Sequence, residues 1–348
     1  MRGSSLPVTG VLTLATDDGP PAPRCPAVAR ATARGQRIPP RAHRAEGDAH
    51  RRCTLHPGAG ADARVRSYTE AMTSDTSSVA PHKVVIMARG LGTRMRKDVD
   101  GVELTEDQAS AAAAGIKAMI TLGGRPFLDH VISCLADVGY DEFCLVIGPE
   151  HDVVRDYYDA QPKERVSISY AVQQEPLGTA DAVAAAEEFA GRDRVLVINS
   201  DNFYPSRAVA ELGTVPASAT LGFTKRAMLA ESNIDPERIK AFALLERDED
   251  GQLVDIIEKP SDEVVAAAGE DALVSMNCFL LTPRIFEACR SIEKSPRGEF
   301  EIVDAVRWMV DHGERFDVVP VEAGVLDMSN RGDIASVVEA LSGEQVRL

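Results

Sequence analysis

From Lys83 onward, short apolar runs alternate with segments whose apolar residues recur every three or four positions. The runs KVVIMA, FCLVIG and RVLVINSDN are almost continuously apolar, as is typical of buried parallel strands. The segment PFLDHVISCLADVG has apolar residues at helical spacing: Leu128, Val131, Ile132, Leu135 and Val138. This alternation predicts right-handed βαβ units on a mainly parallel sheet, with a ligand site at the carboxyl ends of the strands.

The pattern changes after about Ala219. FALLERDEDGQLVDIIEKP predicts two strands joined by a turn, and LVSMNCFLLTP and RFDVVPV predict two more strands. RIFEACRSI, EFEIVDAVRWMVDHG and GDIASVVEALSG have helical periodicity. We therefore expect a Rossmann-like fold with three layers, α/β/α, in which residues 83–218 and 219–348 form two halves of one domain.

Residues 1–82 have neither helical nor strand periodicity and are rich in Ala, Arg, Pro and Gly. Such a composition buries too little apolar surface to offset the entropy lost on ordering. We therefore expect a disordered N-terminal extension or a mis-assigned start, with Met72 as a natural beginning. A targeting peptide is the weaker interpretation, because no clear cleavage site follows the apolar stretch LPVTGVLTLA.

Composition and charge exclude several function classes. The six cysteines are scattered without a CxxC pair, which favours a reducing, cytoplasmic setting and argues against structural zinc. No apolar run approaches the length of a membrane span, so we expect no membrane partner. Residues 83–348 hold 27 Lys and Arg against 47 Asp and Glu, whereas residues 1–82 hold 11 Arg against 7 acidic residues. An acidic body argues against nucleic acid as a partner, because that affinity rests on neutralising phosphates.

The stretch MARGLGTRMRK places Gly90 and Gly92 directly after an apolar strand. Glycine allows close backbone approach, and successive N–H groups in such a turn can bind phosphate. Arg94, Arg96 and Lys97 add positive charge. The stretch matches neither GxxxxGK[ST] nor the full GxGxxG pattern, so on its own a solvated turn explains it equally well.

Two further motifs follow predicted strands. QQEPLGTADAV places the amide of Gln173 five residues before Gly178 and Thr179, which open a helix, and an amide there can bind the edge of a base. NSDN places Asp201 at the carboxyl end of a buried strand, where packing explains a carboxylate poorly. Mg²⁺ beside substrate phosphates is a natural partner for that carboxylate.

The second half adds two charged motifs. IIEKP offers adjacent charges of opposite sign, Glu258 and Lys259, at a strand end, and VLDMSN places Asp327 at a strand-to-helix junction, where it is a candidate second metal ligand. Taken singly, each motif also has an ordinary structural explanation as a helix cap, a turn or a surface ion pair.

Together and in this order, the motifs resemble those of the sugar-1-phosphate nucleotidyltransferases, which join a nucleoside triphosphate to a sugar phosphate and release pyrophosphate. RGLGTRM is similar to the family's glycine-rich loop, and GIKAMITLGGRPFLDHVI to its lysine segment, with Lys117 in the lysine's place. QEPLGTADA resembles the base-binding segment, NSDN and VLDMSN the metal segments, and EKP the sugar-phosphate segment. The resemblance covers roughly residues 83–341, and the set is specific although no single member is.

The resemblance implies a GT-A-like nucleotidyltransferase fold, with nucleotide bound by residues 83–218 and sugar phosphate by residues 219–348. It implies Mg²⁺ as the cofactor, held by Asp201 and Asp327, and as catalytic residues Arg94, Lys117 and Asp201. The implied nucleotide contacts are Ala88, Arg89, Gly90, Gly92, Thr93, Gln173, Gly178 and Thr179. The implied sugar-phosphate contacts are Glu258, Lys259 and Asn277. The attacking phosphate is already an anion, so no general base is needed, and a homodimer is expected only from the family.

Three features depart from the family pattern. Arg89 replaces the first glycine of the usual pair. About twenty residues separate Lys97 from Lys117, more than the usual few, and their ELTEDQASAAAAG predicts a short helix that covers the site. The last motif is VLDMSN, so Ser329 or Asn330 is a candidate to share the second metal position.

Several alternatives remain open from the sequence. The acceptor could be a sugar-like cyclitol phosphate, such as valienol 1-phosphate, or a choline-phosphate-type substrate. A non-catalytic nucleotide-binding regulatory subunit of the same fold would keep the pocket, but the joint presence of Arg94, Lys117, Asp201, Lys259 and Asp327 argues against it. A glycosyltransferase would need a DxD-type pair of acids, and NSDN offers one.

Overall fold

The computed structural model describes residues 80–90, 92–97 and 104–348, so nearly all of the extension predicted over residues 1–82 lies outside the described residues. The strands are β1 (Lys83–Met87), β2 (Thr121–Leu122), β3 (Arg125–Pro126), β4 (Glu142–Ile147), β5 (Ser167–Val172), β6 (Val195–Asn199), β7 (Asn202–Phe203), β8 (Ser218–Thr224), β9 (Leu244–Arg247), β10 (Leu253–Ile257), β11 (Leu273–Leu281), β12 (Phe316–Val321) and β13 (Leu326–Asp327).

The helices are α1 (Glu106–Ala114), the 3₁₀ turn η1 (Lys117–Met119), α2 (Phe127–Asp137), α3 (Asp152–Ala160), α4 (Thr179–Ala185), α5 (Glu187–Ala190), α6 (Ser206–Gly213), α7 (Lys225–Glu231), α8 (Pro236–Ile239), α9 (Asp262–Ala268), α10 (Arg284–Ser291), α11 (Ile302–Asp311) and α12 (Asp333–Ala340). None of the described helices is long and apolar enough to cross a membrane.

In the described part of the chain, nine strands form one mixed sheet, in the order β10-β9-β11-β6-β1-β4-β5, with β8 paired to β11 and to β12. The ladders β6-β1-β4-β5 and β8-β12 are parallel and hold most of the paired residues. The ladders around β9, β10 and β11 are antiparallel. Long β11 therefore joins the parallel ladders β6-β1-β4-β5 to the antiparallel pair β9-β10.

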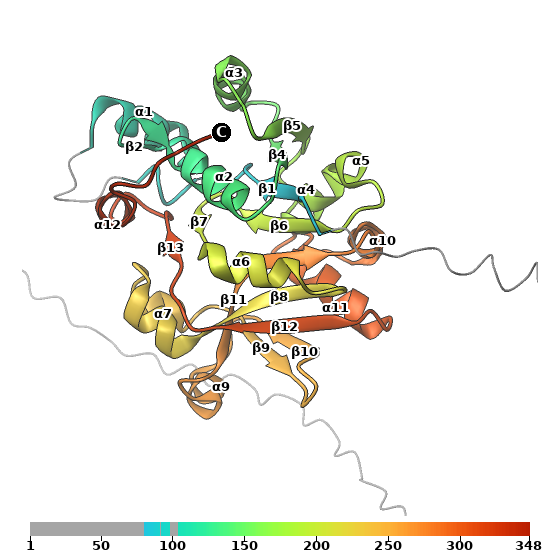
Figure 1. Ribbon diagram of the computed structural model, residues 1–348. Helices are drawn as coiled ribbons and strands as arrows, with labels where there is room; N and C mark the ends of the chain where they lie inside the picture. The colour runs from blue at the N-terminus through green and yellow to red at the C-terminus, as the bar shows by residue number, and fades with distance from the viewer. Residues whose placement is uncertain (1–79, 91, 98–103) are drawn as a thin grey trace, which may run out of the picture. The chain divides into compact units, whose positions relative to one another are not determined.

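Helices cover both faces of the sheet, which explains the continuous apolar runs of the strands. Alternate residues of β1 face opposite cores: Val84 and Ile86 pack with α2 and α6, whereas Val85 and Met87 pack with α4, α10 and α11. Figure 1 shows α2 and α6 on one side of the sheet and α10 and α11 on the other. The three-layer α/β/α prediction is confirmed.

Two details differ from the sequence-based expectation. The helix predicted to open at Gly178 and Thr179 is followed directly by a second helix: α4 and α5 are divided at Ala186, whose N–H donates to the carbonyl oxygen of Val183 three residues back. The pairing of the two-residue strands β7 and β13 was also not predicted. They pair antiparallel, with Asp327 opposite Asn202, and so join segments far apart in the sequence.

Candidate active site

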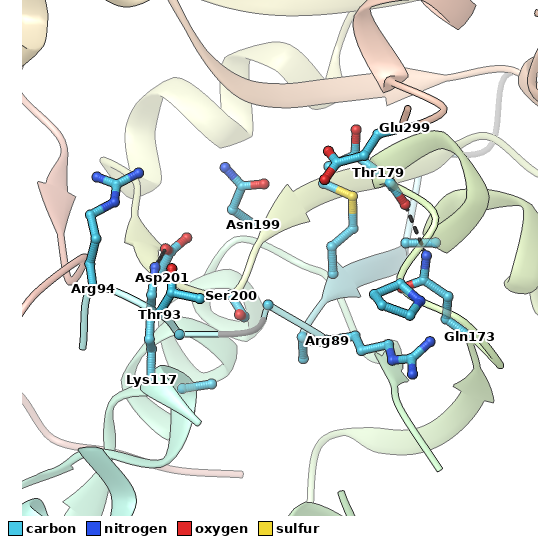
Figure 2. Close-up of a pocket in the computed structure, with 18 residues that line it drawn as sticks. Arg89, Thr93, Arg94, Lys117, Gln173, Thr179, Asn199, Ser200, Asp201 and Glu299 are labelled. Atoms are coloured by element: carbon cyan, nitrogen blue, oxygen red, sulfur yellow. Dashed lines mark hydrogen bonds and ion pairs between the residues drawn. The ribbon is translucent and has the colours of Figure 1, made fainter. Parts of the chain in front are cut away.

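A cavity of about 400 Å³ lies at the carboxyl ends of β1, β5 and β6 (Figure 2). Its lining includes every residue of the first half that the sequence placed in the site: Ala88, Arg89, Gly90, Gly92, Thr93, Arg94, Lys117, Gln173, Gly178, Thr179 and Asp201. This position agrees with the rule that parallel α/β sheets bind ligands at the carboxyl ends of their strands.

The glycine-rich loop after β1 packs directly on the segment that the sequence identified as an insertion. Gly92 has φ +58°, and a Cβ at this position would lie 2.1 Å from the carbonyl oxygen of Gly115, at the end of α1. Arg96 strengthens the contact, because its Nη2 donates to the carbonyl oxygen of Ala114 at 2.9 Å. The predicted insertion helix exists as α1, and its carboxyl end supports the loop.

Arg94 lies at the mouth of the cavity, opposite Gln173 in the view of Figure 2. Its side chain is exposed and makes no hydrogen bond or ion pair to any other described residue. Thr93 beside it is also exposed. The loop therefore presents a cation and backbone groups to the cavity, an arrangement that suits an anionic ligand.

The amide of Gln173 is fixed in orientation by two acceptors. Its Nε2 donates to the carbonyl oxygen of Gly178 at 2.9 Å and to Oδ2 of Asp181 at 2.8 Å. Because both partners accept hydrogen bonds, the nitrogen must face them, and Oε1 is left as an acceptor.

A loop from the second half forms the wall next to α4, and the sequence did not predict its role. Gly178 has φ +119°, and a Cβ there would lie 2.3 Å from the carbonyl oxygen of Phe300. Phe300 donates to Leu177 at 2.7 Å and accepts from Ala180 at 2.9 Å, which brings Glu299 into the lining. The local signal was weak: a glutamate after a glycine, just before a helix.

Six further residues line the cavity but were not identified from the sequence: Met87, Ala118, Pro176, Ala182, Asn199 and Ser200. Asn199 and Ser200 belong to the NSDN motif, so their place directly before Asp201 could have identified them.

Asp201 and Asp327 are brought together by the β7–β13 ladder. The N–H of Met328 donates to the carbonyl oxygen of Asp201 at 2.8 Å, and Asp327 lies opposite Asn202. Each carboxylate has a cationic partner: Lys117 contacts Asp201 at 2.7 Å, and Arg238 contacts Asp327 at 2.6 Å. Asp327 does not line the cavity as Asp201 does, but the two segments that carry them are hydrogen-bonded neighbours.

Burial raises the pKa of Asp327, and the negative charge of Asp201 raises it further, although Arg238 opposes both effects. Two carboxylates that repel one another in a partly desolvated site are stabilised by a cation between them. Carboxylate oxygens are also the ligands that Mg²⁺ prefers. The donor set therefore fits a divalent cation. The carboxamide oxygen of Asn330 instead accepts the N–H of Gly332 at 2.8 Å.

The residues expected to contact sugar phosphate do not line the cavity. Lys259 (φ +47°) and Asn277 (φ +54°) are the only non-glycine residues with left-handed backbones among those described. Asn277 lies where the pairing of β11 with β8 shifts register, and the carbonyl of neighbouring Met276 accepts the hydroxyl of Tyr204 at 2.7 Å. Asn277 lies inside β11, within the strand predicted over LVSMNCFLLTP, at an irregularity of the pairing.

Glu258 follows β10 and is half-buried. Burial raises the pKa of its carboxyl, and the negative charge of Glu301 raises it further, while Arg297 lowers it. Glu301 is the N-cap residue of α11, two residues after Glu299, and its Oε1 accepts a hydrogen bond from Nε of Arg297 at 3.0 Å. Glu258 therefore lies beside the loop that brings Glu299 into the cavity.

With this geometry in place, comparison with known proteins identifies the family. Residues 83–328 match the family model described as Nucleotidyl transferase. The chain is 28% identical to a UTP–glucose-1-phosphate uridylyltransferase of Haloferax volcanii, over 75% of this chain and 97% of that protein. It is 27% identical to a glucose-1-phosphate thymidylyltransferase of Streptomyces antibioticus, over 73% of this chain and 65% of that protein.

Among solved structures, a UDP-glucose pyrophosphorylase complexed with UDP-glucose superposes with a TM-score of 0.60 at 19% identity, covering 76% of this chain and all of that one. At this identity the likeness supports the fold alone. Because the family model spans most of the chain, the protein belongs to the nucleotidyl transferase family.

Proposed function

We propose that the protein transfers a nucleotidyl group from a nucleoside triphosphate to a sugar 1-phosphate, giving a nucleotide sugar and pyrophosphate. The observation that carries this proposal is the cavity, which is lined by a glycine-rich loop, the exposed Arg94, the Lys117–Asp201 pair and an oriented Gln173. The relatives named above act on glucose 1-phosphate according to their names, which favours a sugar phosphate over a choline-phosphate-type acceptor.

In this proposal the glycine-rich loop and Arg94 hold the triphosphate. Backbone N–H groups and a guanidinium neutralise the charge that develops on the departing pyrophosphate, and such electrostatic stabilisation is a major part of phosphoryl-transfer catalysis. Lys117 lies beside Asp201 within the cavity and would contact the α-phosphate. The acceptor phosphate is already ionised, so none of these residues needs to remove a proton.

Asp201 and Asp327 would hold Mg²⁺. A bound divalent cation would supply charge neutralisation and alignment of the two substrates for an in-line displacement. Asp201 is partly exposed to the cavity, whereas Asp327 is buried behind it. Asn202 and Arg238 orient the Asp327 carboxylate, through contacts of 3.0 Å and 2.6 Å.

Lys259, Glu258 and Asn277 would bind the sugar phosphate. Left-handed backbone at a non-glycine residue costs of order 1–3 kcal/mol and persists where the surrounding structure enforces it, often at ligand sites. That Lys259 and Asn277 both adopt it supports a ligand role that the sequence motifs suggested independently. The ammonium of Lys259 would pair with the phosphate, and Glu258 would accept hydrogen bonds from hydroxyl groups.

Pyrophosphate release tests the proposal. The purified protein is incubated with each of UTP, dTTP, GTP, ATP and CTP against a panel of sugar 1-phosphates, a cyclitol phosphate and choline phosphate, with and without Mg²⁺. We expect metal-dependent release with at least one nucleotide and one sugar phosphate. Turnover with choline phosphate alone would overturn the proposed acceptor, and nucleotide binding without any turnover would favour the regulatory alternative.

A further inference from the structure

Arg89 lines the cavity, and one nitrogen of its guanidinium has no partner among the described residues. The residue is 9% exposed and lines the cavity, and its Nε and Nη2 reach the largely exposed carboxylate of Glu150 only at 3.4 Å. Its Nη1 is buried and has no partner among the residues the structure describes. A buried N–H without an acceptor costs free energy of folding. A bound ligand that supplied an acceptor to Nη1 of Arg89 would remove this cost.

Arg89 and Gln173 flank the carboxyl end of the same strand, β4. The N–H of Ala88, before Arg89, donates to Val146, and the N–H of Gln173 donates to Ile147, each at 2.9 Å. The two residues are thus about two strand spacings apart, roughly 10 Å between Cα atoms, a gap that a long side chain can bridge. Figure 2 shows both on the side of the cavity away from Arg94 and Lys117.

This wall combines donors and an acceptor. The guanidinium of Arg89 can only donate hydrogen bonds, and the Oε1 of Gln173 can only accept them, because its Nε2 is held by Gly178 and Asp181. A complementary ligand edge has a carbonyl oxygen next to a ring N–H. Uracil, thymine and guanine have such an edge, whereas adenine and cytosine have an amino group and an unprotonated ring nitrogen at the equivalent positions.

We propose that Arg89 is a specificity-determining residue that donates to a ring carbonyl of the nucleobase, while Gln173 accepts the adjacent ring N–H. The site would therefore select uracil, thymine or guanine against adenine and cytosine. The family pattern has a glycine at this position, so the assignment belongs to this chain. It rests on the proposed function only in taking the cavity as a nucleotide site.

The test measures binding rather than turnover. Isothermal titration calorimetry gives the Kd of UTP, dTTP, GTP, ATP and CTP, and of UMP and GMP, for the full chain and for Arg89→Met and Arg89→Lys. We expect the wild type to prefer the keto bases. Arg89→Met should weaken the preferred nucleotides, including the monophosphate, roughly ten- to a hundred-fold, as expected for a hydrogen bond from a charged group, and should change ATP and CTP little.

Arg89→Lys separates base recognition from attraction to phosphate, because it keeps the charge but not the planar fork. We expect it to lose discrimination as well. Glu150→Gln is the matched control: it removes the ion-pair partner and should leave discrimination unchanged. Thermal unfolding of each variant verifies that the protein is folded.

An equal loss of affinity for all five triphosphates would assign Arg89 to phosphate binding and overturn the inference. So would unchanged discrimination in folded Arg89→Met, or a wild-type preference for adenine or cytosine. Absence of pyrophosphate release with every acceptor would instead reject the proposed function, and the binding data would still decide the role of Arg89.

Discussion

The two halves of the domain build their parts of the site differently. In residues 83–218, parallel strands end in glycine-containing turns, and Gly92 and Gly178 are required by close contacts with the backbone of Gly115 and Phe300. In residues 219–348, polar side chains lie within or just after antiparallel strands, and two of these residues, Lys259 and Asn277, have left-handed backbone. The first half lines the cavity, and the second contributes Glu299 to it.

The two halves thus differ in the groups that they offer to a ligand: the first offers mainly backbone groups, and the second offers mainly side chains. Backbone groups cannot be replaced by mutation, so the proposed triphosphate contacts of the glycine turns are set by the course of the chain. The proposed sugar-phosphate contacts of Lys259 and Glu258 come from side chains and can change with single substitutions. The two halves should therefore respond differently to mutation, and the largest response should come from the aspartate nearest their junction.

Asp201→Asn should have the largest effect. The amide cannot neutralise a divalent cation, so kcat should fall by on the order of 10²-fold or more. Steady-state pyrophosphate release measures this, and electron paramagnetic resonance of added Mn²⁺ measures metal binding directly. Asp193→Asn, which removes an exposed partner of Lys83, is the matched control and should leave both unchanged. Wild-type Mn²⁺ binding in Asp201→Asn would exclude Asp201 as a ligand.

Lys259→Asn should affect the sugar phosphate alone. Asparagine tolerates left-handed backbone, so this change removes the charge and keeps the local conformation. We expect the KM for sugar phosphate to rise roughly ten- to a hundred-fold and the KM for the triphosphate to stay within about two-fold. Lys240→Asn, at an exposed position, is the control. A rise confined to the triphosphate KM would reverse the assignment of the two halves.

Gln173→Ala should affect the nucleotide alone. Loss of one neutral hydrogen bond is worth roughly 0.5–1.5 kcal/mol, so the preferred triphosphate should bind about two- to ten-fold more weakly, with poorer discrimination between bases. Gln174→Ala, at the exposed neighbouring position, should change neither. If the sugar-phosphate KM rose instead, Gln173 would not belong to the base site.

Glu258→Gln should have the smallest effect, and on stability rather than on nucleotide binding. Because the folded-state pKa of Glu258 is raised, the folded protein holds this proton more tightly, and its contribution to stability is lost as pH rises through that pKa. The variant should therefore unfold at a slightly higher temperature than the wild type near pH 7, with no difference below about pH 4. Differential scanning calorimetry at both pH values, with Glu249→Gln as the exposed control, measures this. A variant less stable at pH 7 would contradict it.

The spacing of apolar residues along the sequence predicted the sheet and the helices that cover it. A strand buried on both faces needs a continuous apolar run, and a helix that packs on a sheet needs an apolar stripe. The first half of the site was predictable for a related reason: Gly92, Gln173 and Asp201 each lie in a loop that follows a parallel strand, so their positions at one edge of the sheet follow from topology.

Contacts between distant segments were not predictable. Glu299 enters the cavity because Phe300 pairs with Leu177 and Ala180, and nothing near residue 299 encodes that partner. Pairing of two-residue strands likewise leaves no periodicity to detect. Arg238, which holds Asp327, lies on a helix of four residues, α8, which is too short to show a helical periodicity.

The β7–β13 ladder determines how late during synthesis the site can be completed. Asn202 and Asp327 are 125 residues apart in the chain, and closing a loop of that length costs roughly 4 kcal/mol of entropy. On the ribosome, the glycine-rich loop and Asp201 emerge long before their partner aspartate. We expect a nascent chain that ends before residue 327 to form much of its sheet but to have no catalytic activity.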